Sequence, residues 1–179
     1  MGWLKRHIGL TSLGEFGFKR WLDSHAFEVL AEIRVKVGQV VLDFGCGSGT
    51  YTIPAAKLVG KDGRVYALDI NRAALDRMEE KAKQEGLNNV VRIDVSGGEK
   101  IPLEDESIDL MLLIDVLQEV DDKGALFDEA YRILKSGGIV SVYPMHVSEK
   151  DVIMLATSRC FLLKERKFDE RILIFSRAR

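Results

Sequence analysis

The residues with the clearest chemical potential lie in one short stretch, VLDFGCGSGTYT (residues 41–52). An apolar run that includes Asp43 is followed by glycine at positions 45, 47 and 49. Glycine loses the most backbone freedom on folding, so three in alternation predict positive φ angles or another group packed against the main chain. The helix expected next would direct free N–H groups at a polar or anionic ligand. A plain strand-to-helix turn would need similar glycines, so the loop alone identifies no ligand.

A second acidic residue favours a ligand. Asp69 ends the next expected strand, 20 residues after Gly49, where a carboxylate can accept hydrogen bonds from both hydroxyls of a ribose. A nucleoside-containing cofactor is therefore predicted. The spacing G-x-G-x-G differs from the dinucleotide fingerprint G-x-G-x-x-G. Asp43 would also repel a pyrophosphate, whereas it suits an ammonium or a sulfonium.

Strands and helices that alternate along the chain would position these residues. The expected strands are 40–44, 64–69, 90–94, 108–115 and 139–144, and the expected helices are 51–59, 72–85, 123–134 and 149–159. Gly137–Gly138 are expected to form a turn into the last of these strands. The alternation predicts an α/β fold with a doubly wound parallel sheet. The tail predicts an antiparallel hairpin that turns near Phe168 and Asp169.

The amino-terminal part of the chain stands outside this alternation. Residues 1–35 carry Trp, Phe and Leu among charged residues, a pattern typical of amphipathic helix. No repeat or low-complexity linker divides the chain. We therefore expect residues 1–179 to form a single domain, with residues 1–35 as a helical cover or lid and residues 36–179 as a Rossmann-like core.

Composition excludes several classes of protein. The 179 residues are 46% apolar and 30% charged, with a formal net charge of -2, as in ordinary soluble globular proteins. The absence of a Lys/Arg block argues against nucleic acid. The apolar runs are too short to span a membrane, and no secretory signal is expected. Cys46 and Cys160 lack the spacing of a metal site, so we expect no metal and a cytoplasmic, reducing location.

Four segments resemble the successive motifs of class I S-adenosylmethionine-dependent methyltransferases: VLDFGCGSGTYT, VYALDIN, RIDVSGGEKIPLEDESIDLMLLIDVLQEV and EAYRILKSGGIVSVY. The chain is most similar to the small-molecule branch that includes the ubiquinone/menaquinone-biosynthesis methylases. The resemblance implies a mostly parallel seven-stranded sheet with a C-terminal antiparallel hairpin, the Rossmann-like methyltransferase fold. The pair Gly97–Gly98 departs from the family pattern in the adenine-side loop.

The resemblance also implies S-adenosyl-L-methionine as the cofactor and a role for residues at the strand ends. The implied contacts are Asp43 and the main chain of Gly45, Cys46, Gly47 and Gly49 to the methionine part, Asp69 to the ribose, Ile70, Asp94 and Val95 to the adenine, and Asp115 and Val116 to the sulfonium end. Each acid has a structural alternative. Asp94 could cap a loop, and Asp115 could cap the next helix.

Methyl transfer from a sulfonium mainly requires alignment of donor and acceptor. A base is needed only where the acceptor keeps its proton at neutral pH. His146, after the fifth expected strand, and His25, in the expected cover, are the candidate catalytic residues, and His7 is a weaker one. A histidine in either place could equally be a surface or packing residue.

The expected acceptor is a small or lipid-like molecule, and a protein side chain stays open. LIDVLQEV stands where methylases of exocyclic base amines carry an Asn/Asp-Pro-Pro-aromatic motif. Two alternative functions also stay open. One is a catalytically inactive cofactor-binding partner subunit. The other is a nicotinamide-dependent oxidoreductase, which would need a third glycine one position later and a Tyr-x-x-x-Lys pair. The sequence carries no signal for an oligomeric state.

Overall fold

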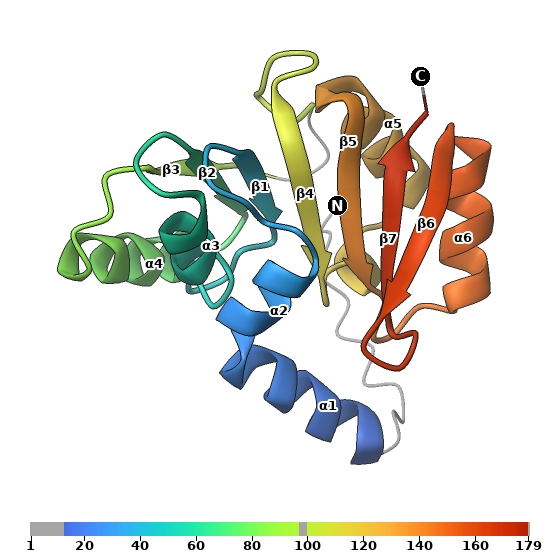
Figure 1. The fold of residues 1–179 in the computed structure, drawn as a ribbon, viewed down its shortest axis with the longest axis horizontal. Coiled ribbons are helices and arrows are strands. Elements are labelled where there is room, and N and C mark those ends of the chain that lie inside the picture. The colour runs from blue at the N-terminus through green and yellow to red at the C-terminus, as the bar shows by residue number, and fades with distance from the viewer. Residues whose placement is uncertain (1–12, 97–99, 179) are drawn as a thin grey trace.

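The computed structural model describes residues 13–96 and 100–178 (Figure 1). His7 and the Gly97–Gly98 pair lie outside the described residues, as does the first third of the expected cover. Within the described residues one sheet holds seven strands, β1 (Val40–Phe44), β2 (Arg64–Asp69), β3 (Val90–Asp94), β4 (Ile108–Ile114), β5 (Leu134–Tyr143), β6 (Phe161–Lys167) and β7 (Ile172–Arg177).

The strand order is β3-β2-β1-β4-β5-β7-β6. Strands β1 to β5 are parallel, and β7 pairs antiparallel with both β5 and β6. The predicted fold class, a mostly parallel sheet with a C-terminal antiparallel hairpin, is therefore confirmed. The order reverses between β1 and β4, and in such sheets ligands bind beyond the carboxyl ends of the strands at that point.

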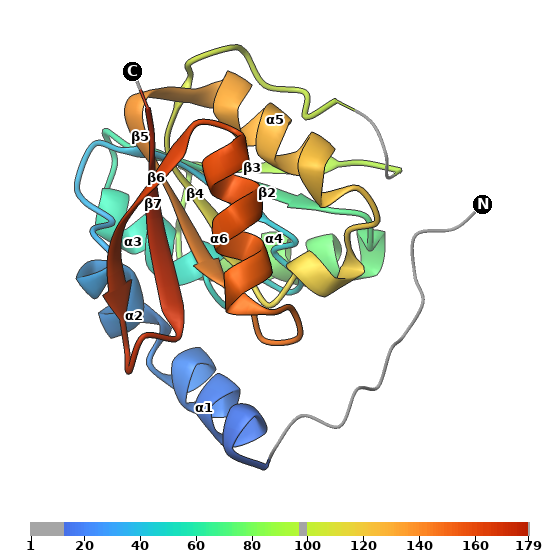
Figure 2. The same cartoon turned by 90° about the vertical axis from the view of Figure 1, so that its right-hand side faces the viewer.

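Helices cover both faces of the sheet. The described helices are α1 (Leu13–Ser24), α2 (Ala26–Glu32), α3 (Thr52–Val59), α4 (Arg72–Gln84), the short 3₁₀ turn η1 (Leu117–Glu119), α5 (Lys123–Ile133) and α6 (Glu149–Ser158). In β1, Val41 packs with α1, α2 and α3, whereas Leu42 packs with α5 and α6. Figure 2 shows α2 and α3 on one side of the sheet and α5 on the other. Burial on both faces explains why β1 and β4 are almost continuously apolar.

Local signals set the ends of these elements. The Asn71 side chain accepts a hydrogen bond from the Ala74 N–H at 3.1 Å and caps α4, and Gly86 follows that helix with φ of 66°. The hairpin turns at Phe168 and Asp169, where the turn was predicted, and both residues have positive φ. One boundary differs from the expectation. Strand β5 already begins at Leu134, and the expected Gly137 turn is a bulge within it opposite β4.

The connection from β3 to β4 contains no helix within its described residues, 95–96 and 100–107. Ile101 and Leu103 pack on the sheet instead. Arg132 of α5 donates hydrogen bonds to the carbonyl oxygens of Ile101 and Leu103, both at 2.8 Å, and pairs with Asp105 at 2.7 Å. One guanidinium therefore anchors a crossover that a helix would otherwise form.

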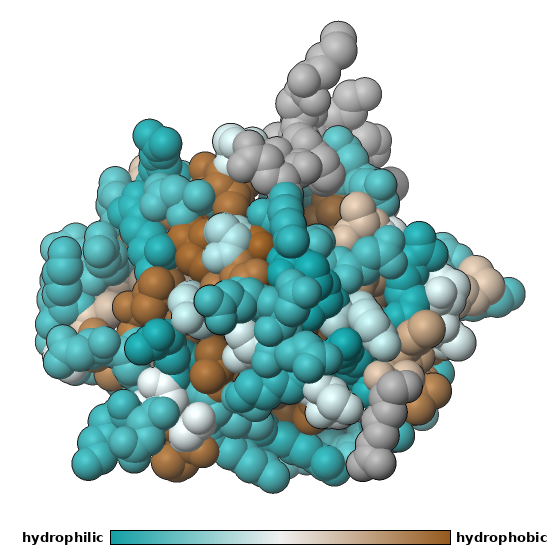
Figure 3. Space-filling model, turned by 90° about the horizontal axis from the view of Figure 1, so that it is seen from above, coloured by the Kyte–Doolittle hydropathy of each residue, from teal (hydrophilic) through white to brown (hydrophobic). Residues whose placement is uncertain are grey.

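The two ends of the sheet differ in character. Helix α1 lies across the end to which the parallel strands point (Figure 1). Viewed from the opposite end, the surface is mostly hydrophilic, with apolar side chains gathered in a limited area (Figure 3). Large apolar side chains are exposed on α1 and α2 as well, namely Phe16, Trp21 and Phe27.

Candidate cofactor and acceptor site

The loop after β1 folds back on β2 through its main chain. The N–H groups of Gly45 and Cys46 both donate to the Leu68 carbonyl oxygen, at 2.8 and 3.0 Å. Gly45, Gly47 and Gly49 have φ of 74°, 54° and 85°, a region that non-glycine residues rarely adopt. The first of the two possible reasons for the glycines, backbone turning, therefore applies to all three.

Close packing explains two of the glycines further. A Cβ on Gly45 would overlap the Val116 side chain, and one on Gly49 would lie 2.7 Å from Met78 Cγ. A Cβ on Gly47, by contrast, would meet no heavy atom of the described residues within 4 Å, its chain neighbours aside. The middle of the loop therefore presents bare main chain to open space, as a cradle for a ligand requires.

Asp69 holds this cradle in place. One carboxylate oxygen accepts the Gly47 N–H at 2.7 Å, and the other accepts the Asn71 N–H at 2.8 Å. A carboxylate has about four lone-pair sites, so two hydrogen bonds leave capacity for ribose hydroxyls. The next residue, Ile70, is 43% exposed and lies where the adenine face is predicted. Asp69 thus has both a structural role in the loop and free acceptor sites.

Asp43 lies beneath the loop and is 3% exposed. The Thr52 hydroxyl donates to its carboxylate at 2.6 Å. Burial, with a smaller contribution from the charge of Asp69, raises the pKa of Asp43 to about 6. A ligand cation here would restore the ionised form, so the residue fits an ammonium or sulfonium group.

Cys46 is buried among Ala67, Leu75 and Met78, and burial raises the pKa of its thiol. Its side chain fills space behind the loop, so only its main chain faces the cradle. Val116 is buried against Gly45. These two residues shape the site by packing.

Asp94 ends β3 in register with Asp69 of β2. Its two oxygens accept hydrogen bonds from Arg92, at 2.7 and 2.9 Å, and the guanidinium lowers the pKa of the Asp94 carboxyl. The Val95 N–H donates to the Asp69 carbonyl oxygen at 3.4 Å. Asp94 already has a side-chain partner, and its adenine contact stays a prediction.

Asp115 follows β4 with φ of 55°. Gln118 of η1 donates to one carboxylate oxygen at 2.9 Å, and Lys19 of α1 lies 3.9 Å from the other. Burial raises the pKa of Asp115 although Lys19 opposes the shift. Burial and the charges of Asp115 and Asp69 raise the pKa of Glu119, which ends η1.

The two candidate histidines differ in their surroundings. The His25 ring stacks on Trp21 at a centroid distance of 4.7 Å, and Nδ1 lies 2.9 Å from the Trp21 carbonyl oxygen. His146 is exposed in the turn after β5, and its charge acts to lower the pKa of the Asp115 carboxyl. The structure therefore brings His146, and not His25, to the strand ends.

Helix α1 lies over these strand ends. The Tyr143 hydroxyl at the end of β5 donates to Glu15 at 3.0 Å, and the Tyr51 hydroxyl beside the glycine loop donates to Asp23 at 2.9 Å. None of Lys19, Gln118 and Glu119 was predicted from the sequence as a site residue. The only available signal for the last two was their place directly after a strand at the switch point. For Lys19 no sequence signal exists.

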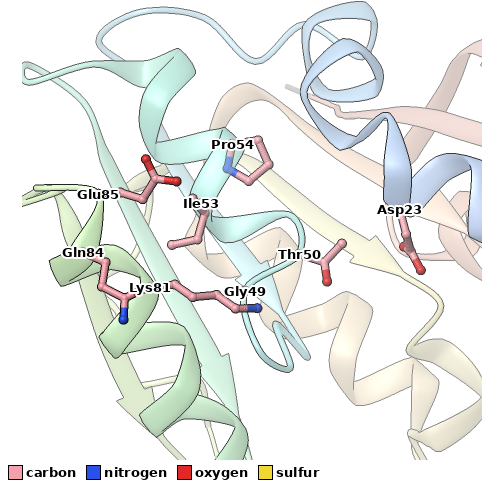
Figure 4. Close-up of a pocket in the computed structure, with 8 residues that line it drawn as sticks. All are labelled: Asp23, Gly49, Thr50, Ile53, Pro54, Lys81, Gln84 and Glu85. Atoms are coloured by element: carbon pink, nitrogen blue, oxygen red, sulfur yellow. The ribbon is translucent and has the colours of Figure 1, made fainter.

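A hollow of about 490 Å³ opens beside the glycine loop (Figure 4). Its lining comes from α1, the loop, α3 and the end of α4: Asp23, Gly49, Thr50, Ile53, Pro54, Lys81, Gln84 and Glu85. Lys81 reaches the loop and donates to the Ser48 carbonyl oxygen at 2.8 Å. None of the acids at the strand ends lines the hollow, so the hollow lies to one side of the cradle.

No group of three or more His, Cys, Asp or Glu side chains that could hold a metal ion occurs in residues 13–96 and 100–178. Across the same ranges, no helix is long and apolar enough to cross a membrane.

The switch point, the bare main chain at Gly47 and the carboxylate of Asp69 together define a nucleoside-binding domain of Rossmann-like class. Comparison with known proteins identifies the family. The family model described as "Methyltransferase domain" matches residues 35–170, and the chain belongs to this family. The predicted family is therefore confirmed, and its cofactor is S-adenosylmethionine.

Curated relatives and solved structures agree with this family. The chain is 31% identical to a demethylmenaquinone methyltransferase of Lactobacillus johnsonii over 74% of its length and 54% of the relative's. It is 34% identical to the ubiquinone/menaquinone biosynthesis C-methyltransferase UbiE of Hydrogenovibrio crunogenus, over 74% and 51%. The chain thus spans about half the length of these curated relatives.

A crystal structure of a SAM-dependent methyltransferase from Aquifex aeolicus has the same fold, with a TM-score of 0.77 and 22% identity. The alignment covers 92% of this chain and 98% of that one. The fold therefore also occurs in a solved chain of about the same length as this one.

Proposed function

We propose that this protein transfers a methyl group from S-adenosylmethionine to a small, lipid-like acceptor of the quinol class. The observation that carries the proposal is the cradle, in which the Gly47 main chain faces open space and Asp69 holds the loop from the neighbouring strand. The similarity to demethylmenaquinone methyltransferases supports the acceptor class.

The bound cofactor would supply a methyl group on a sulfonium, a leaving group that needs no further activation. Asp69 would bind the ribose, and Asp43 would bind the ammonium of the methionine part. Helix α1 would exclude water, since Glu15 and Asp23 hold it over the ends of β5 and the glycine loop. Orientation by these residues can itself contribute several powers of ten in rate.

We further propose that residues 1–35 act as the cover of one domain and that the protein works in a reducing compartment, the cytoplasm. The described part of the cover packs on the sheet through Leu22, Val29 and Leu30, which are buried. Cys46 and Cys160 are both free thiols, one buried and one exposed. A reducing compartment keeps an exposed thiol in that state.

Calorimetric titration tests the cofactor. We expect S-adenosylmethionine and S-adenosylhomocysteine to bind and NAD not to bind. The Asp69→Ala variant should lose roughly 1.5–3 kcal/mol of binding free energy, because charge-assisted hydrogen bonds to the ribose and to the Gly47 loop disappear. Asp62→Ala, which changes an exposed acid before β2, is the matched control. Binding of NAD alone, or an unchanged affinity of Asp69→Ala, would contradict the proposal.

Transfer of labelled methyl to a reduced naphthoquinone tests the activity. Incorporation supports an active enzyme. Cofactor binding without incorporation into quinols, lipid extracts or protein would instead support the inactive partner subunit.

A further inference from the structure

Asp115 is held in a conformation that a simple helix cap does not require. Its φ of 55° lies in the left-handed region, which costs a non-glycine residue about 1–2 kcal/mol. Strand pairing nevertheless continues through it, because its N–H donates to the Tyr143 carbonyl oxygen at 3.1 Å. Strained residues of this kind cluster at functional sites. The conformation places the carboxylate at the carboxyl end of the sheet, with 24% of the side chain exposed.

His146 reaches the same place from the neighbouring strand. Ile114 of β4 pairs with Tyr143 of β5, so the segments that follow these strands emerge side by side. His146 is exposed three residues after Tyr143, at the same edge of the sheet as Asp115. Within the described part of the chain, no side chain forms a hydrogen bond or an ion pair with its ring nitrogens. The imidazole is therefore free to meet a second molecule.

Other charged and titratable groups also face Asp115. They are Lys19 and Asp23 from α1, Glu119 from η1, Tyr51 beside α3, and Tyr143 from β5. Lys19 lies 2.7 Å from Asp23 but 3.9 Å from Asp115, so its main partner is Asp23. Gln118 supplies the side-chain hydrogen bond that Asp115 receives from the described residues. The carboxylate thus keeps acceptor capacity for an imidazole N–H.

We infer that Asp115 and His146 form a proton-accepting pair on the acceptor side of the site, for an acceptor with a phenolic hydroxyl. The O–H bond of the acceptor breaks and an N–H bond forms on the His146 ring, while the electron pair stays on the phenolic oxygen. Asp115 is then a positioning residue whose negative charge stabilises the imidazolium, and not a contact of the cofactor as the family resemblance implied. The inference rests on the proposed function.

The chemistry of the acceptor gives the pair its purpose. Phenols hold their proton near neutral pH, with a pKa of about 10 for tyrosine, and ionisation makes the ring electron-rich. An imidazole can accept and release a proton, which suits a general base. Deprotonation of a quinol acceptor would therefore need this pair, whereas cofactor binding would not.

A coloured phenol tests the pair without turnover. 4-Nitrophenol is added to the full chain saturated with S-adenosylhomocysteine, at a pH where most of the free dye is neutral. We expect the absorbance of the phenolate to rise with the wild-type protein and to be lost in His146→Gln and Asp115→Asn. Lys150→Gln and Asp121→Asn, which change exposed residues nearby, are matched controls that should keep the rise.

Titration of the histidine rings by NMR tests the role of Asp115 directly. Asp115→Asn should lower the pKa of His146 by at least about 0.5 unit, because a neighbouring negative charge stabilises the imidazolium. A merely structural residue would not move this value. Both variants should bind S-adenosylhomocysteine within about twofold of wild type, a difference well below the 1.4 kcal/mol of a tenfold change.

Three results would overturn the inference: an unchanged pKa of His146 in Asp115→Asn, no rise of phenolate with the wild-type complex, or a tenfold loss of S-adenosylhomocysteine affinity in Asp115→Asn. Failure of the wild-type protein to bind S-adenosylhomocysteine would instead contradict the proposed function.

Discussion

At the scale of single residues, Asp43, which we propose binds the cofactor, carries a cost in stability because its carboxyl is buried. The side chain is buried, and the Thr52 hydroxyl donates a hydrogen bond to its carboxylate. Burial raises the pKa of Asp43 to about 6 in the folded chain, above its ordinary value of 3.8. The folded chain therefore binds more protons than the unfolded chain between these values, and stability falls as pH rises through this window.

Asp43→Asn should remove this cost while keeping the size of the side chain. The difference of about 2 pKa units corresponds to roughly 3 kcal/mol. We expect the free energy of unfolding, variant minus wild type, to rise from near zero at about pH 4 to a few kcal/mol above about pH 6. Urea unfolding across this range measures it.

The same variant should bind S-adenosylhomocysteine more weakly at neutral pH, because the negative charge that faces the ammonium is gone. Asp62→Asn, at an exposed position, provides the control for both measurements. A stability difference that does not vary with pH would show that the Asp43 carboxyl is not the group responsible.

At the scale of elements, two glycines with the same backbone conformation, Gly47 and Gly86, have different surroundings. Gly47 and Gly86 have φ of 54° and 66°, and a Cβ on either would meet no atom within 4 Å among the described residues. Gly47 faces the cradle, whereas Gly86 only ends α4. Both positions therefore require positive φ, but only Gly47 lies in the proposed site.

Gly47→Ala and Gly86→Ala form a matched pair. Each should lower the free energy of unfolding by about 1–2 kcal/mol, because alanine is strained at positive φ. Only Gly47→Ala should weaken S-adenosylhomocysteine binding, by about tenfold or more, equivalent to at least 1.4 kcal/mol. Thermal unfolding and calorimetry measure the two effects. Equal affinities for the two variants would remove Gly47 from the site.

At the scale of the whole molecule, α1 joins parts that are distant in the sequence. Glu15 receives the Tyr143 hydroxyl, Trp21 packs against Phe168 of the hairpin turn, and Arg171 stacks on Phe18. The helix thus contacts β5, the hairpin and the glycine loop at once. A ligand bound beneath it would add contacts to its inner face.

Hydrogen exchange followed by mass spectrometry tests this cover. With S-adenosylhomocysteine, the amides of α1 should exchange more slowly, because ligand binding stabilises the closed arrangement. The amides of α6, on the other face of the sheet, serve as the internal control and should change less. Equal protection of both helices would indicate global stabilisation and would contradict a specific role of α1 as a lid.

Much of the architecture was predictable because local rules act over short stretches. Apolar runs indicated β1 and β4, Asn71 and Gly86 marked the ends of α4, and the polar turn near Phe168 marked the hairpin. The family motifs located the cradle. The start of β5 was missed because its bulge at Gly137 depends on pairing with β4, which no local signal encodes.

The sequence by itself determined the order of elements, the family and the cradle, since all three depend on residue types at short spacing. Only the tertiary structure decided which side chains from distant parts of the chain contact one another. It brought Lys19 of α1 to Asp115, the Tyr143 hydroxyl to Glu15 and the Tyr51 hydroxyl to Asp23. Such partners are set by which strand ends meet at the switch point and by how α1 crosses them, so they join residues as far apart as Glu15 and Tyr143.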